Sequence, residues 1–86
     1  MMILAVFRSR AHSLDYAERL RRHGIEAATV SAPREAIIGW GLCVRFDANV
    51  LLRAQAILRT GRYASFKGFY KVEQRNGQML ISLFRK

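Results

Sequence analysis

Cysteine is nearly absent from this sequence, because Cys43 is its only copy among 86 residues. A single cysteine excludes an internal disulfide framework and a zinc site made of cysteines. The two histidines lie far from it along the chain, so no metal-ligand spacing is present, and neither a P-loop nor a G-x-G-x-x-G motif occurs. We therefore predict no metal and no cofactor, and a reducing location, the cytoplasm.

Acidic residues and long hydrophobic runs are scarce as well. The sequence contains six Asp and Glu but fifteen Lys and Arg, which gives a net charge of +9. Twelve of the fifteen basic residues are Arg. A positive field attracts nucleic acid, phosphorylated ligands or an acidic protein. Arginines that are simply solvated at the surface explain the positive charge equally well. The opening apolar run, closed by Arg8, has no basic stretch before it and is a poor signal peptide. No run approaches the ~20 apolar residues that span a bilayer, so we expect no membrane insertion.

The length of the chain predicts one domain, residues 1–86. A chain this short has one modest core and buries only about 60–65% of the surface that its unfolded form exposes. Two thin layers leave apolar surface uncovered, and association with further copies is a natural way to hide it. We therefore expect a homo-oligomer.

Hydrophobic periodicity divides the first part of the chain into a strand, a helix and a strand. The apolar run at residues 2–7 is typical of a central strand. Ser9 or Ser13 can cap the helix that follows, and Gly24 ends it. The residues expected on the buried face of this helix are Ala11, Leu14, Ala17 and Leu20. Residues 25–31 are the second predicted strand.

The second part of the chain repeats this order. Residues 42–46 alternate in hydrophobicity and predict a half-buried strand. Asp47 or Asn49 can cap a second helix. The apolar stripe predicted for this helix is Val50, Leu51, Ala54, Ile57 and Leu58.

Residues 66–73 and 78–84 are two further predicted strands, joined around Asn76-Gly77, a strong hairpin signal. The elements therefore follow the order βαββαβ, with one more strand at the C-terminal end. Two βα units of this kind predict the α+β class: a ferredoxin-like βαββαβ two-layer sandwich with an extra C-terminal β-hairpin strand.

Residues 32–46, APREAIIGWGLCVRF, gather a Pro-Arg turn, a Gly-Trp-Gly corner and a strand that ends in Arg-Phe. With this pattern the chain resembles the selenium/sulfur (Se/S) carrier protein-like family over about residues 2–72. The matching residues are Phe7, Ser9, Gly24, Ile25, Pro33, Arg34, Glu35, Gly41, Arg45 and Phe46. The resemblance implies a small cytosolic domain that handles sulfur or selenium through a thiol.

The chain departs from the family at the position that matters most. The family's characteristic cysteine stands just before the glycine, and here that position is Trp40. The only other thiol is Cys43, which we expect on the outer face of its strand with Arg45. Two interpretations remain open for it. Cys43 is either a small inert hydrophobe, or a thiol whose pKa a neighbouring arginine lowers.

The same stretch supplies the candidates for binding an anion or a partner: Arg34, Trp40, Gly41 and Arg45. Trp40 either anchors a partner or packs against one end of the core. The glycines beside it permit a loop whose free amides could receive an anion, which Arg34 could help to hold.

Two further patterns give weaker indications of function. The run at residues 67–72, KGFYKV, half-resembles an RNA-recognition signature, but an aromatic strand packed under a helix or across a dimer explains it as well. His12, Ser13 and Asp15 lie within one turn of a helix and cannot form the convergent geometry of a catalytic triad. An ordinary enzyme is therefore not expected.

The sequence favours a non-catalytic binding domain, with the family's thiol function lost or displaced to Cys43. Three alternatives remain: an Arg-rich nucleic-acid-binding module, a structural subunit of a homo-oligomer, and an active sulfur or selenium carrier that uses Cys43.

Overall fold

The computed structural model describes residues 1–31 and 42–84, with the side chain of Met79 outside this description. Its elements are strand β1 (Met2–Phe7), helix α1 (Arg10–Arg22), strand β2 (Ala28–Ser31), strand β3 (Leu42–Asp47), the 3₁₀ turn η2 (Ala48–Val50), helix α2 (Leu51–Gly61), strand β4 (Phe66–Arg75) and strand β5 (Gln78–Leu83). Within the described residues the strands form one antiparallel sheet in the order β2-β3-β1-β4-β5.

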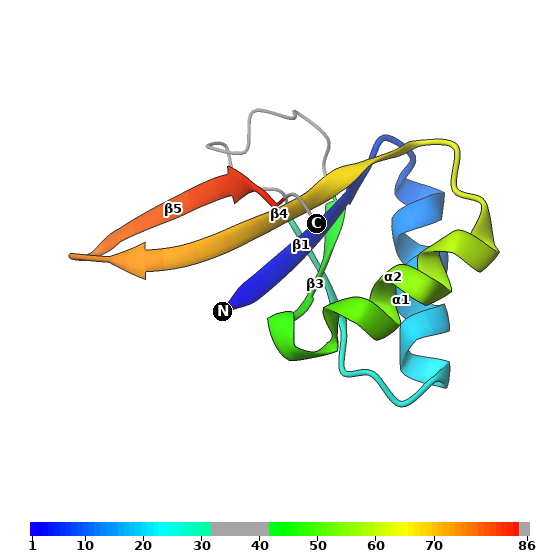
Figure 1. Ribbon diagram of the computed structural model, residues 1–86. Helices are drawn as coiled ribbons and strands as arrows, with labels where there is room; N and C mark the ends of the chain where they lie inside the picture. Colours follow the sequence, from blue (N-terminus) through cyan, green and yellow to red (C-terminus); the bar gives the residue numbers. More distant parts are fainter. Residues whose placement is uncertain (32–41, 85–86) are drawn as a thin grey trace.

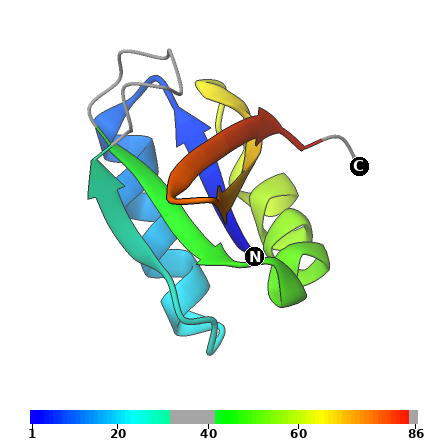
Figure 2. The same ribbon diagram turned by 90° about the vertical axis from the view of Figure 1, so that its left-hand side faces the viewer.

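The first four strands have the ferredoxin-like order, and β5 extends the sheet beside β4. Both helices lie on one side of the sheet (Figure 1), and Figure 2 places α1 behind β2, β3 and β1. The predicted α+β sandwich with an extra hairpin strand is therefore confirmed. No described helix is long and apolar enough to cross a membrane.

The core lies between the sheet and the helices, and aromatic rings fill one end of it. The ring of Phe7 lies 5.3–5.4 Å, centroid to centroid, from those of Tyr16, Tyr63 and Phe66. Tilted and edge-to-face pairs of this kind add to the stabilisation from area burial. Helix α2 adds Leu51, Ala54 and Ile57 from its predicted apolar stripe.

The buried face of helix α1 is the predicted one at Ala17 and Leu20 but not at Ala11 and Leu14. Its buried residues are Ser13, Tyr16, Ala17 and Leu20, whereas Ala11 is exposed and Leu14 is 47% exposed. Ser13 is buried because its hydroxyl donates to the Leu42 carbonyl at 3.1 Å. A hydroxyl can enter a core at little cost when it finds an acceptor there, and hydropathy alone does not show that partner.

The ends of the elements follow local sequence signals. The Ser9 hydroxyl accepts the His12 amide at 3.1 Å and caps α1, and Gly24 follows the helix with φ +78°. The second strand is shorter than predicted, because Ile25 packs into the core before β2 begins. Asn76 and Gly77 both have positive φ, as a two-residue turn that matches the sheet twist requires.

Tyr16 joins the two helices through a buried hydrogen bond, since its hydroxyl donates to the Ala54 carbonyl at 2.7 Å. We expect Tyr16→Phe to lower the free energy of unfolding in urea by about 1 kcal/mol, the net value of such a bond. Tyr70→Phe is the matched control, because Tyr70 is half-buried and its hydroxyl has no hydrogen bond within the described residues. Equal stability changes in the two variants would contradict this role.

Candidate functional site

The face of the sheet opposite the helices is lined by apolar side chains. Strand alternation and register direct Leu4 and Val6 of β1 and Cys43 of β3 to this face. Partly buried side chains of β2 and β4 pack around them: Val30, Tyr70 and Val72. We call this set of six residues the open-face cluster, because no described helix covers it (Figure 2).

Cys43 sits in the middle of the open-face cluster. Val6 on one neighbouring strand and Val30 on the other are its register partners. Val44 and Phe46 point to the helix side, so Cys43 and Arg45 share the opposite face. The exposed fraction of Cys43 is 0%, and this burial raises the pKa of its thiol to about 11. A buried, protonated thiol is a weak nucleophile at neutral pH.

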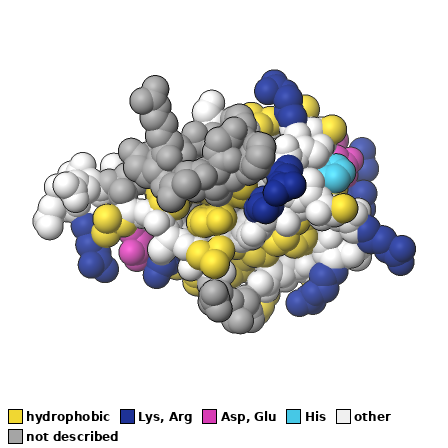
Figure 3. Space-filling model, turned by 90° about the horizontal axis from the view of Figure 1, so that it is seen from above, with side chains coloured by type: hydrophobic (Ala, Val, Ile, Leu, Met, Phe, Trp, Pro, Cys, Tyr) yellow, Lys and Arg dark blue, Asp and Glu magenta, His cyan; other side chains and the backbone are white. Residues whose placement is uncertain are grey.

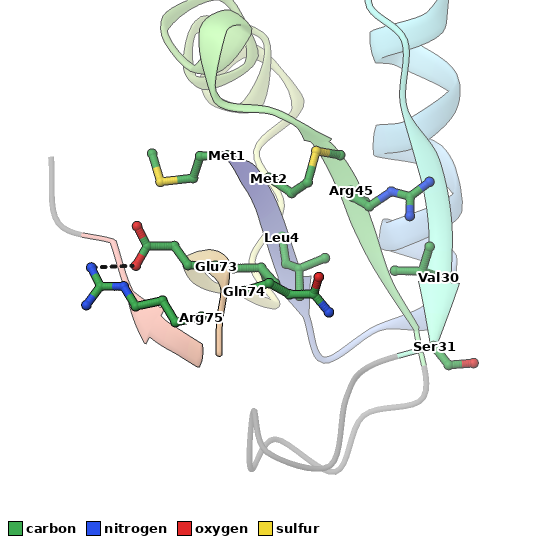
Figure 4. Close-up of a pocket in the computed structure, with 10 residues that line it drawn as sticks. Met1, Met2, Leu4, Val30, Ser31, Arg45, Glu73, Gln74 and Arg75 are labelled. Carbon is green, nitrogen blue, oxygen red and sulfur yellow. Dashed lines mark ion pairs between the residues drawn. The ribbon is translucent and has the colours of Figure 1, made fainter. Parts of the chain in front are cut away.

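Arg45 differs from Cys43 on the same face, because the side chain of Arg45 is exposed. It forms no hydrogen bond or ion pair within the described residues. It stands between two hollows of the surface. The first is mainly apolar: a groove of about 680 Å³ over Leu4, Val30 and Val72, with Arg45 at its β3 side (Figure 4).

The second hollow, of about 700 Å³, lies toward the start of η2 and is more polar. Arg45 also borders it, together with the acidic residues Glu26 and Asp47. The Asp47 carboxylate is already engaged, since it accepts the Asn49 amide at 2.9 Å. Among the residues that the structure describes, no three His, Cys, Asp or Glu side chains gather into a possible metal site.

Three of the sequence-predicted site residues, Arg34, Trp40 and Gly41, lie outside the described residues. The structure therefore places only Cys43 and Arg45 of the predicted set. It also brings to the Arg45 groove residues that the sequence did not single out: Leu4, Val30, Val72 and Gln74. Strand alternation could have indicated a shared face, but the pairing of β1 with both β3 and β4 was needed to bring them together.

Three polar residues in and before α1, namely Ser9, His12 and Asp15, contact the segment before β4. His12 Nδ1 lies 2.6 Å from the Ser65 hydroxyl, and Ser65 also accepts the Ser9 amide at 3.2 Å. The Tyr63 hydroxyl donates to the Asp15 carboxylate at 2.5 Å, and this bond is the main cause that lowers the pKa of Asp15. These contacts join the start of α1 to the segment before β4. The sequence offered no periodic signal for Tyr63 and Ser65.

The segment that half-resembles an RNA-binding strand is part of β4. Phe69 faces the core and Tyr70 faces the open side, so one aromatic of this segment is available for stacking on that side. In the view of Figure 3, lysine and arginine side chains are scattered around the described surface and do not gather into one basic patch. Neither feature favours base recognition over strand packing.

The buried position of Cys43 predicts slow alkylation. A rise of the pKa from 9.0 to about 11 lowers the thiolate fraction at neutral pH about 100-fold, and burial hinders the reagent further. We expect iodoacetamide at pH 7.5 to modify native protein at least that much more slowly than protein unfolded in urea, as followed by mass spectrometry. Equal rates in the two states would show that Cys43 is exposed.

The same shift predicts a pH dependence of stability. Because the folded-state pKa lies above the unfolded one, stability is fully present below pH ~9 and falls as the pH rises toward ~11. Cys43→Ala should remove the part of the alkaline loss of stability that is due to this thiol, as measured by the free energy of unfolding in urea as a function of pH.

A comparison with protein families agrees with the fold and the sequence pattern. The family model described as "Putative Se/S carrier protein-like" matches residues 2–71, which include every described element except β5 and the last residues of β4. No curated protein and no solved structure matches the chain. Since the matched region covers most of the 86 residues, the chain belongs to the Se/S carrier protein-like family.

Proposed function

We propose that this chain is a non-catalytic binding domain of the Se/S carrier-like family, which has lost the thiol function and binds an anion or a protein partner through its open sheet face. The observation that carries the proposal is the complete burial of Cys43 in the open-face cluster. A single cysteine, which needs no oxidising compartment, supports a location in the cytoplasm.

A carrier thiol must reach two partners in turn, one that delivers the sulfur or selenium atom and one that accepts it. This requires an accessible thiolate. Cys43 lies in the third strand, between β1 and β2, and its side chain packs against Leu4 and Val6. Exposing it would require the sheet to open or the cluster to separate. The resemblance to the family puts its cysteine at the position of Trp40, and Cys43 is the only cysteine of the sequence, so no second thiol could serve as the carrier.

The open face retains features that suit binding. A small domain with helices on one side of its sheet leaves the other side for a ligand or a partner. Here that side combines a half-buried apolar surface with the guanidinium of Arg45, which has no hydrogen bond or ion pair within residues 1–31 and 42–84. Arginine holds carboxylates and phosphates through parallel hydrogen bonds, so an anionic group is the natural partner of Arg45.

The test of the lost carrier role uses a low-molecular-weight persulfide and intact-mass analysis. Native wild-type protein should acquire no added sulfur, whereas the same protein unfolded in urea should. The double variant Trp40→Cys, Cys43→Ala places a thiol at the family position, and we expect it to acquire sulfur in the native state. A stable adduct on native wild type that Cys43→Ser abolishes would refute the proposal.

A structural role in a homo-oligomer is the second candidate, and β5 favours it. This strand lies at the edge of the sheet and carries no charged residue from Gln78 to Leu83. Leu80 is 42% exposed and Leu83 is 47% exposed, and the β4–β5 hairpin reaches beyond the helices (Figure 1). Natural edge strands usually carry charges, prolines or bulges that prevent pairing, so an uncharged apolar edge is suited to pair with a second copy.

This candidate predicts that Leu80→Lys shifts the protein toward monomer. Sedimentation velocity at micromolar concentrations measures the change, because a charge on the edge opposes strand pairing. Leu52→Lys is the matched control, since Leu52 is 71% exposed on α2 and lies away from β5. Wild-type protein that is monomeric throughout this range would exclude the oligomer.

A further inference from the structure

The groove beside Arg45 has the size and lining of a small-molecule site. Its volume of about 680 Å³ lies within the range of about 300–1,000 Å³ that such sites occupy. Its floor is formed by Leu4 of β1, Val72 of β4 and Val30 of β2, three strands that meet only in the folded sheet. Leu4 is 4% exposed and belongs to the open-face cluster, so the packed surface of the sheet forms the floor of the groove.

The two sides of the groove differ in charge. Figure 4 shows Arg45 on one side of Leu4, with Glu73 and Arg75 on the other. The Arg75 guanidinium lies 4.0 Å from the Glu73 carboxylate, so these two charges largely compensate each other. Arg45 has no such partner in the described part of the chain. Among the described side chains that line the groove, the uncompensated charge is therefore the positive charge of Arg45, at the β3 side.

An apolar floor beside an arginine that has no partner among the described residues fits a ligand with one charged part and one apolar part. We propose that the groove binds a monoanion with a short apolar chain, such as a medium-chain carboxylate. The carboxylate accepts hydrogen bonds from the Arg45 guanidinium, and the chain lies across Leu4 toward Val72. This proposal rests on the proposed function, because it assigns a ligand class to the open face.

The arrangement also explains which ligands are disfavoured. A small inorganic anion would meet Arg45 but leave the half-buried side chains of Val30 and Val72 in contact with water, so it would lose the contribution of buried apolar area. A neutral chain of the same length would cover the floor but form no charge-assisted hydrogen bond.

The experiment is a titration of ¹⁵N-labelled protein with octanoate, octanamide and acetate, followed by amide chemical shifts. We expect octanoate to shift the amides of Leu4, Arg45 and Val72, and to bind more tightly than either analogue. Arg45→Gln should weaken octanoate binding about tenfold, the usual cost of losing a hydrogen bond to a charged group, and should leave octanamide binding unchanged. Val72→Thr, which keeps the shape but adds a hydroxyl, should weaken both ligands.

Arg59→Gln is the matched control, because Arg59 is also exposed and has no hydrogen bond or ion pair within the described residues, but it lies on α2. It should leave octanoate affinity unchanged. Thermal unfolding of each variant shows that the fold is retained. Absence of octanoate binding, equal binding of octanoate and octanamide, or equal effects of Arg45→Gln and Arg59→Gln would each overturn the proposal.

Persulfide transfer to Cys43 is measured separately from this titration. If octanoate does not bind and Cys43 does not react, the ligand class is rejected and the proposed loss of the carrier role stands.

Discussion

Burial of strand β1 on both faces is the constraint on which the rest of the structure depends. Its odd-numbered residues, Ile3, Ala5 and Phe7, belong to the core under the helices. Its even-numbered residues Leu4 and Val6 belong to the open-face cluster. Both edges are also paired, with β3 on one side and β4 on the other. Since a one-residue slip would exchange the two faces, this strand sets the register of the whole sheet.

The register explains the contrast between Cys43 and Arg45. Val6 opposes Cys43 and Leu4 opposes Arg45 across the β1–β3 pair. Cys43 is small and lies over the middle of the sheet, so apolar neighbours from β1 and β2 enclose it. Arg45 is long and lies two residues nearer to the end of the strand, where its guanidinium reaches solvent. The same face therefore carries a buried thiol and an exposed charge.

The strand that carries Cys43 and Arg45 lies within the region that matches the family. The family match extends over residues 2–71 and so includes all of β3 with Cys43 and Arg45. Within the described residues, the open-face cluster and the exposed Arg45 lie on the side of the sheet opposite the helices. Strand β5 lies beyond the matched region and enlarges this face beside β4.

Most of the secondary structure could be predicted from the sequence, because it rests on local signals. The apolar run of β1, the Asn76-Gly77 turn and the glycine after α1 act over a few residues each. The buried face of α1 was predicted wrongly at Ala11 and Leu14, because Ser13 and Tyr16 enter the core through hydrogen bonds to Leu42 and Ala54. Those acceptors lie on distant segments of the chain.

The sequence by itself determined the fold class, the family pattern, the single thiol and the excess of arginine. Only the tertiary structure decided that Cys43 is buried and Arg45 is available, since both residues sit on the same face of one strand and alternation treats them alike. It also assembled the groove, because Leu4, Val30 and Val72 come from three strands. The physical reason is that burial and cavities depend on which segments pair, and pairing is a property of the whole sheet.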